Sequence, residues 1–175
     1  MVACGILALQ SCTKLASLLN FNLSMQTETV NITIPVVTDT SGVFTVGPTT
    51  NNYNVDSFIR ASTSNQLGEA NITSVKISSV SLVLNNPTAA SNFQDFQSCS
   101  ASFFSNTNTT PYTLSIADNP DVYSSALLLP VDTSVNLATY LGNEFTYSFS
   151  GKLRRPTTTP LSCTITFTFS VSVQG

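Results

Sequence analysis

The sequence predicts an all-β fold, an antiparallel two-sheet β-sandwich of about eight or nine strands with one or two short helices. Three observations lead to this prediction. Apolar and polar residues alternate strictly along several segments, which is typical of half-buried strands. Ser, Thr and Asn fill the polar positions, as suits strands and turns. Only 9% of the 175 residues are charged, against about 25% in ordinary soluble domains, so long helices are not expected.

The alternation is clearest toward the C-terminus. Residues 145–153 carry aromatic and aliphatic side chains at one parity and hydroxyl side chains at the other, and residues 163–173 repeat this pattern. Residues 154–160 connect the two segments and include two prolines, which are common in turns. We therefore predict that the two segments pair as one long hairpin.

Shorter alternating segments lie upstream. Residues 30–34 alternate without interruption, whereas residues 75–84 change parity at Ser78 and Ser79. One extra residue at that point predicts a β-bulge. The remaining strands are expected at residues 21–25, 43–46, 99–104, 112–116 and 126–129.

Helix is expected in two short places. Val55, Phe58 and Ile59 have the i, i+3, i+4 spacing of a helix face within residues 54–61, and Asn54 can cap that helix. Residues 135–141 are expected to form a second helical turn, closed by Gly142.

The first twelve residues have the pattern of an export signal. An apolar run is followed by Leu9, Gln10, Ser11 and Cys12, and the run is too short to cross a bilayer, which takes about 20 apolar residues. This segment resembles the lipobox of bacterial lipoproteins of the Bacteroidetes type. The resemblance implies cleavage before Cys12, lipidation of its sulfur, and attachment to the outer membrane of a cell envelope, on either its periplasmic or its surface face.

The expected organisation follows from that resemblance: a signal peptide at residues 1–11, a tether at 12–17 and one sandwich domain at 18–175. Two other interpretations of the N-terminal segment stay open. It is an ordinary signal peptide, or it is the first buried strand or helix of the mature fold.

Four cysteines are present. Cys4 would leave with the signal and Cys12 would carry the lipid, so Cys99 and Cys163 remain. Both lie in strand-like segments at the apolar parity, and exported proteins fold in an oxidising compartment. We predict a disulfide between Cys99 and Cys163, and the alternative is two buried free thiols.

The composition argues against catalysis, cofactors and metals. The chain has no histidine, which removes the commonest general base and metal ligand. It has no nucleophile-elbow, phosphate-loop or dinucleotide-binding motif. Its six basic residues and net charge of −3 do not suit nucleic acid. We expect no enzyme activity, no cofactor and no metal site.

Half of the basic residues stand close together. Lys152, Arg154 and Arg155 are candidates for contact with an anionic ligand. The alternative is that these charges protect the tip of a hairpin from pairing with other chains.

Two functions fit the sequence. The first is a lipid-anchored binding or scaffolding module of the cell envelope, without catalysis and with a protein or glycan partner not identified by the sequence. The second is a subunit of an extracellular filament, a homo-polymer assembled by strand exchange through residues 163–173.

Overall fold

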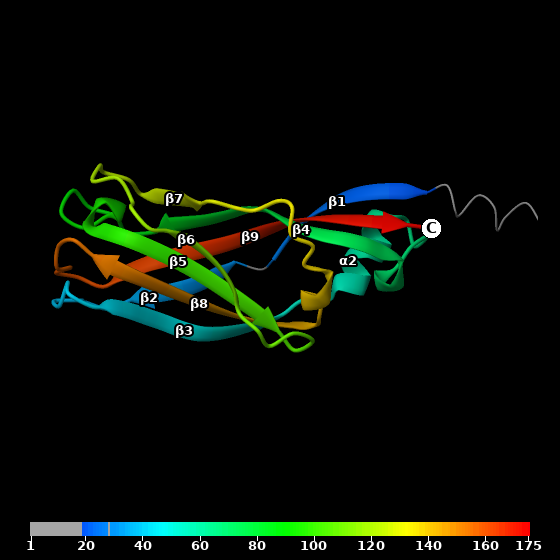
Figure 1. Cartoon of the computed structure of the whole chain (residues 1–175), viewed down its shortest axis with the longest axis horizontal. Coiled ribbons are helices and arrows are strands. Elements are labelled where there is room, and N and C mark those ends of the chain that lie inside the picture. The colour runs from blue at the N-terminus through cyan, green and yellow to red at the C-terminus, as the bar shows by residue number, and fades with distance from the viewer. Residues whose placement is uncertain (1–18, 28) are drawn as a thin grey trace, which may run out of the picture.

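The computed structural model describes residues 19–27 and 29–175. Within these residues nine strands form two antiparallel sheets that pack face to face (Figure 1). Sheet A contains β1 (Asn20–Gln26), β2 (Val30–Ile34), β4 (Ile72–Leu84), β7 (Ala126–Leu129) and β9 (Leu161–Gln174). Sheet B contains β3 (Val43–Asn52), β5 (Phe96–Ser105), β6 (Tyr112–Ile116) and β8 (Glu144–Leu153). The predicted β-sandwich is confirmed.

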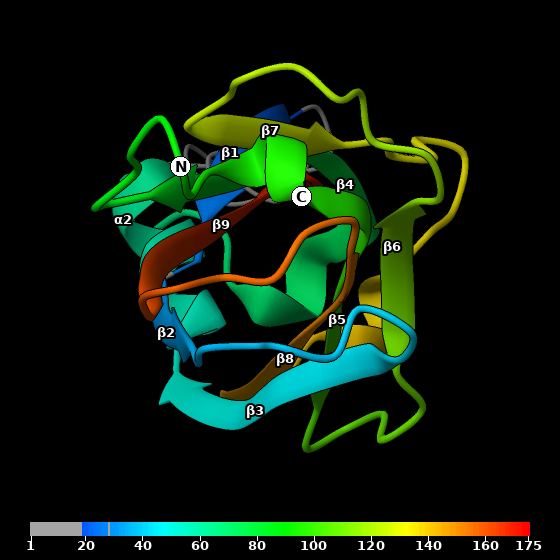
Figure 2. The ribbon, with the colours of Figure 1, turned by 90° about the vertical axis from the view of Figure 1, so that its left-hand side faces the viewer.

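The strand order is that of a jelly roll. Sheet A runs β1-β9-β4-β7, with β2 also pairing with β9, and sheet B runs β3-β8-β5-β6. From β2 onward the chain changes sheet at every connection except that between β5 and β6. Without β1, which extends the edge strand β2, the two sheets have four strands each and are interleaved as is typical of jelly rolls. Figure 2 looks along the sandwich, with β3 and β8 on one side of the core and β7 and β4 on the other.

Strand β9 lies in the middle of sheet A. One of its edges pairs with β4 along most of its length, and its other edge pairs first with β2 and then with β1. Strands β1 and β2 therefore act as one interrupted edge strand. The inward side chains of β9, from Leu161 to Val173, are all buried.

The predicted hairpin of residues 145–153 with 163–173 is wrong. Strand β8 lies in sheet B, between β3 and β5, and β9 lies in sheet A. Residues 154–160 therefore cross from one sheet to the other. The alternation of side chains reports which face of a strand is buried, and it has the same form whether two neighbouring segments pair or face each other across a core.

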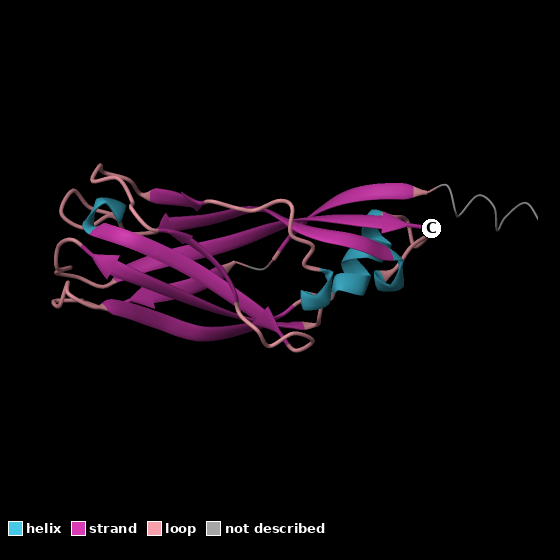
Figure 3. Cartoon of the chain, in the orientation of Figure 1, coloured by secondary structure: helices cyan, strands magenta, loops and turns pink. Residues whose placement is uncertain are grey.

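The local predictions agree better with the structure. The register of β4 against β9 shifts between Ile77 and Ser79, where the bulge was expected. Helix α2 (Val55–Ser62) begins after Asn54, whose side-chain oxygen accepts from the amide of Ser57 at 2.8 Å. The second helical turn is shorter than predicted, a 3₁₀ turn η3 (Ala138–Tyr140). Two further turns, η1 (Glu69–Asn71) and η2 (Phe93–Asp95), also lie near the ends of the sandwich (Figure 3).

Aromatic rings join the two sheets. The ring of Phe103, on β5, lies 5.5 Å from the rings of both Phe167 and Phe169 on β9. On β8, the ring of Tyr147 lies 5.2 Å from Phe167. Rings at such distances and angles add to the free energy gained from burial. This cluster is the centre of the core.

Candidate functional site

The outer face of sheet B consists mainly of hydroxyl side chains. The strand register places these side chains in rows that cross the sheet, such as Thr45, Ser150, Ser100 and Ser115 on four successive strands. We call the set the hydroxyl face. Its members are Thr45, Thr50, Ser98, Ser100, Ser102, Thr113, Ser115, Thr146, Ser148 and Ser150.

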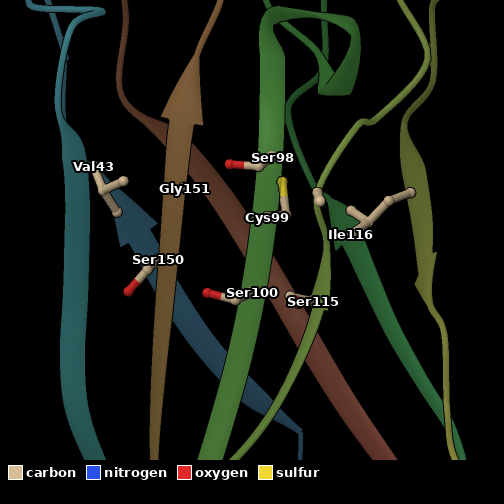
Figure 4. Close-up of a pocket in the computed structure, with 9 residues that line it drawn as sticks. Val43, Ser98, Cys99, Ser100, Ser115, Ile116, Ser150 and Gly151 are labelled. Atoms are coloured by element: carbon tan, nitrogen blue, oxygen red, sulfur yellow. The ribbon is translucent and has the colours of Figure 1, made fainter.

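A shallow depression lies in the hydroxyl face (Figure 4). It has a volume of about 290 Å³, close to the lower end of the range for small-molecule sites. Its lining comes from all four strands of sheet B and the residue after β6: Val43, Ser98, Cys99, Ser100, Ser115, Ile116, Ala117, Ser150 and Gly151. Most of these side chains are small, which leaves the surface hollow here.

The hydroxyl groups of the depression differ in how they are satisfied. Ser150 Oγ is hydrogen bonded to Thr45 Oγ1 at 2.9 Å. Among the described residues, the hydroxyls of Ser98, Ser100 and Ser115 have no hydrogen-bond partner. Figure 4 shows the Ser98 and Ser100 oxygens directed toward β8. These three groups can each donate and accept, so they are available to a ligand.

Lys152 adds a positive charge beside the depression. It lies on β8 directly opposite Val43 on one neighbouring strand and Ser98 on the other. Its neighbours Gly151 and Leu153 are buried and face the core, so Lys152 is on the outward parity. No salt bridge involves Lys152 in the part of the chain that the structure describes.

The two arginines predicted with Lys152 have a different role. Arg154 donates from Nη1 to the carbonyl of Phe96 at 2.8 Å and from Nη2 to Asp118 at 3.2 Å and to the carbonyl of Asn119. These contacts fasten the connection after β8 to the loops beside β5 and β6. We call Arg154 with these contacts the clamp.

Arg155 extends the same clamp. It makes two hydrogen bonds to the carboxylate of Asp121, at 2.8 and 2.6 Å, and lies 3.6 Å from the buried carboxylate of Asp95. The hydrogen bonds and positive charge of Arg155 lower the pKa of Asp121 below its usual value. Contact of Arg154 or Arg155 with an anionic ligand remains a prediction. Both guanidinium groups already form salt bridges with aspartates of the protein.

The predicted disulfide is wrong in this structure. Cys99 and Cys163 are both buried, as expected from their parity, but both are free thiols. Cys99 lies on sheet B and Cys163 on sheet A, so a bond between them would cross the core, as inter-sheet disulfides do in other sandwiches, and the two sulfurs are not bonded. Burial raises the pKa of each thiol to about 12, with the neighbouring Cys163 adding to the effect on Cys99. The alternative of two buried thiols is the one observed.

The outer face of sheet A offers a contrast. Its hydroxyl residues follow β9, and long amide side chains cover both ends of the row. Asn85 donates to Ser162 and Thr164, both at 3.0 Å, and Asn22 accepts from Ser172 at 2.8 Å. On sheet A the amides pair the hydroxyls at the two ends of this row, while the hydroxyls of Thr166 and Ser170 between them have no side-chain hydrogen bond among the described residues. Sheet B differs because its unpaired hydroxyls line a depression.

Sequence reasoning found Lys152 but missed the serines beside it. Ser98, Ser100 and Ser115 were interpreted only as the outer parity of strands, because nothing in the sequence shows that the three strands carrying them and Ser150 are adjacent. Knowledge of the sheet order is the signal that would have found them. The predicted lipidation site Cys12, the signal at residues 1–11 and the tether at 12–17 lie outside the described residues.

Two further searches of the described residues bear on the site. No cluster of acidic, cysteine or histidine side chains suited to a metal ion occurs among them. Their helices are also too short to cross a lipid bilayer.

Comparison with known proteins does not identify a family. No family model matches the chain, and no curated protein does. Among solved structures, a chain of Desmodium yellow mottle tymovirus is similar over 88% of each chain, with 10% sequence identity and a TM-score of 0.31. A likeness at this level carries no conclusion about function.

Proposed function

We propose that this protein is a non-catalytic binding module of a bacterial cell envelope, held at the outer membrane by a lipid on Cys12, which contacts its partner through the hydroxyl face of sheet B. The observation that carries the proposal is the depression lined by three unpaired hydroxyls, with the unpaired Lys152 beside it. A hollow lined by apolar groups and a few convergent polar groups is the default candidate for a binding site.

The chemistry of the depression supports binding rather than catalysis. Its serines have no general base beside them, since the chain lacks histidine and no described carboxylate contacts them. Lys152 is on the outward parity of β8 and half-buried, and among the described residues its amine has no hydrogen bond to these serines. A rigid sheet that presents fixed donors and acceptors is well suited to recognition.

The filament alternative has less structural support. Strand β9 contains residues 163–173, and within its own chain it is paired along both edges. Its donation to a neighbour would break those pairs and expose the inward side chains from Cys163 to Val173. The proposal of a binding module needs no such rearrangement.

Two experiments test the proposed function. Substitution of Cys12 by Ser should release the protein from the membrane fraction of cells that express the full chain, as seen by detergent partitioning. Continued membrane association of the Cys12→Ser protein would contradict the lipid anchor.

The second experiment tests whether the protein binds through the hydroxyl face of sheet B. Ser100→Trp fills the depression, and Ser24→Trp places the same ring on an exposed outward position of β1 in sheet A. Adsorption of the purified protein to isolated envelopes should fall with Ser100→Trp and persist with Ser24→Trp. Equal adsorption of the two variants would contradict binding through the hydroxyl face.

A further inference from the structure

We infer that the depression of sheet B recognises an acidic saccharide, a hydroxyl-rich ligand whose carboxylate pairs with Lys152. The inference rests on the proposed function and adds the chemical class of the ligand. Of the three residues that the sequence suggested for an anionic ligand, the inference assigns only Lys152 to the ligand and assigns Arg154 and Arg155 to contacts within the protein.

The distribution of charge singles out Lys152. Arg60 is paired with Asp56 at 2.6 Å, and Arg154 and Arg155 are bound to aspartates of the clamp. Among the described cations only Lys76 and Lys152 form no salt bridge, and Lys76 lies on β4 in sheet A, on the other side of the sandwich. Lys152, which lies opposite Val43 and Ser98 at the rim of the depression, is therefore the cation nearest to a ligand bound there in the strand register.

No described carboxylate forms a salt bridge with Lys152. On the outward parity of β8 the acidic residue is Glu144, eight positions away, which is about 26 Å at ~3.3 Å per residue. That separation exceeds the screening length of about 8–10 Å in physiological salt. Asp118 follows Ala117 at the edge of the depression, and its carboxylate is held by Arg154. Among the described residues, a ligand carboxylate therefore meets no carboxylate already paired with Lys152.

The uncharged groups define the rest of the ligand. The hydroxyls of Ser98, Ser100 and Ser115 match a ligand that carries several hydroxyls of its own, since each can donate or accept as the ligand requires. Val43 is 67% exposed at the edge of the depression and offers an apolar contact to the C–H groups of a sugar ring. A bare phosphate or sulfate would pair with the cation and accept from the hydroxyls, but it would leave Val43 without a role.

The volume sets the scale of the ligand. A depression of about 290 Å³ that opens to solvent holds one or two sugar rings rather than a long buried chain. Binding to it is expected to be weak and fast, so a method that detects weak complexes is needed. The charge contribution of one exposed ion pair corresponds to about two- to fivefold in affinity.

The test compares two forms of one saccharide by NMR titration of the isotope-labelled full chain. The probes are trigalacturonate and its fully methyl-esterified form, which keeps the ring hydroxyls and lacks the negative charges. We expect amide shifts centred on residues 98–100, 115–117 and 150–152, tighter binding of the acid than of the ester, and weaker binding of the acid in high salt.

Three variants complete the design. Lys152→Gln should reduce the affinity for the acid about two- to fivefold, to that for the ester, and Lys152→Arg should retain the preference for the acid. Lys76→Gln removes the same charge from sheet A and should change neither affinity. Native spectra of all three variants establish that the fold is intact.

The outcomes separate this inference from the function on which it rests. Equal binding of acid and ester, unaffected by Lys152→Gln, overturns the acidic saccharide and leaves binding at the depression in place. No binding of either form, with Ser100→Trp still preventing adsorption to envelopes, also overturns only the ligand class. Shifts confined to sheet A or to the ends of the sandwich overturn both.

Discussion

The two faces of sheet B are made by the same strands and have opposite chemistry. On β5, Phe103 points into the core and contacts the rings of Phe167 and Phe169, while its neighbour Ser102 belongs to the hydroxyl face. The inner face is packed without charge, and the outer face holds unpaired hydroxyls with Lys152. Since side chains alternate along a strand, one parity serves stability and the other is free to serve binding. Substitutions at the two parities should therefore have separate effects.

The largest effect is expected at the centre of the inner face. Phe103→Ala should lower the free energy of unfolding by about 3–5 kcal/mol, because it removes a buried ring and leaves a cavity between the sheets. Phe104→Ala, at the next position and outward, is the matched control and should cost much less. Chemical denaturation of both variants measures the difference. Similar losses in the free energy of unfolding for the two variants would contradict the assignment of stability to the inner face.

A smaller effect is expected where sheet B meets its loops. Arg154→Met keeps much of the side-chain stem but removes the hydrogen bonds to the carbonyls of Phe96 and Asn119 and to Asp118. Hydrogen bonds that involve a charged group contribute about 1.5–3 kcal/mol, so we expect a loss of that size in the same denaturation experiment. An unchanged midpoint would mean that the clamp does not hold these loops in solution.

The second arginine of the clamp should make stability depend on pH. Arg155 lowers the pKa of Asp121 below 3.8, so the pair stabilises the fold fully above pH 3.8 and loses this contribution as the pH falls through the lower value in the folded state. Asp121→Asn should reduce the loss of thermal stability on acidification without abolishing it, because Asp39, Asp56 and Asp132 also have lowered pKa values. Thermal melts between pH 6 and pH 2 compare the two proteins, and parallel curves would contradict the prediction.

The smallest effect on stability is expected on the outer face. Lys152→Gln removes a charge that has no partner in the described part of the chain, and surface changes of this kind usually stay within about 0.5 kcal/mol. The same substitution is the one expected to change the affinity for an acidic saccharide. A large loss of stability would indicate that Lys152 has a structural partner and would weaken its assignment to a ligand.

Local features of this fold were accessible from the sequence because they depend on neighbouring residues. The alternation at residues 145–153 and 163–173 located β8 and β9, the parity change at Ser78 and Ser79 located the bulge, and the spacing after Asn54 located α2. Each of these signals lies within about ten residues of the feature that it predicts.

Features that depend on the assignment of strands to sheets were not accessible. The expected hairpin failed because β8 belongs to sheet B and β9 to sheet A. The depression was missed for the same reason, since Ser98, Ser115 and Ser150 meet only through the order of the strands. The partner of Arg155 was not predicted either, because Asp121 lies 34 positions away in the sequence and contacts Arg155 only in the folded protein.

The position of β9 also constrains how the chain acquires its structure. Its partners β1 and β2 lie within residues 20–34 and its partner β4 within residues 72–84, yet β9 itself spans residues 161–174. During synthesis from the N-terminus, sheet A lacks its middle strand until β9 emerges from the ribosome. Pairing across such sequence separations is slow, on the order of milliseconds to seconds in β-sandwiches. Sheet A therefore stays incomplete until residues 161–174 are available, which leaves a period in which unfolded-chain carriers can bind the nascent chain.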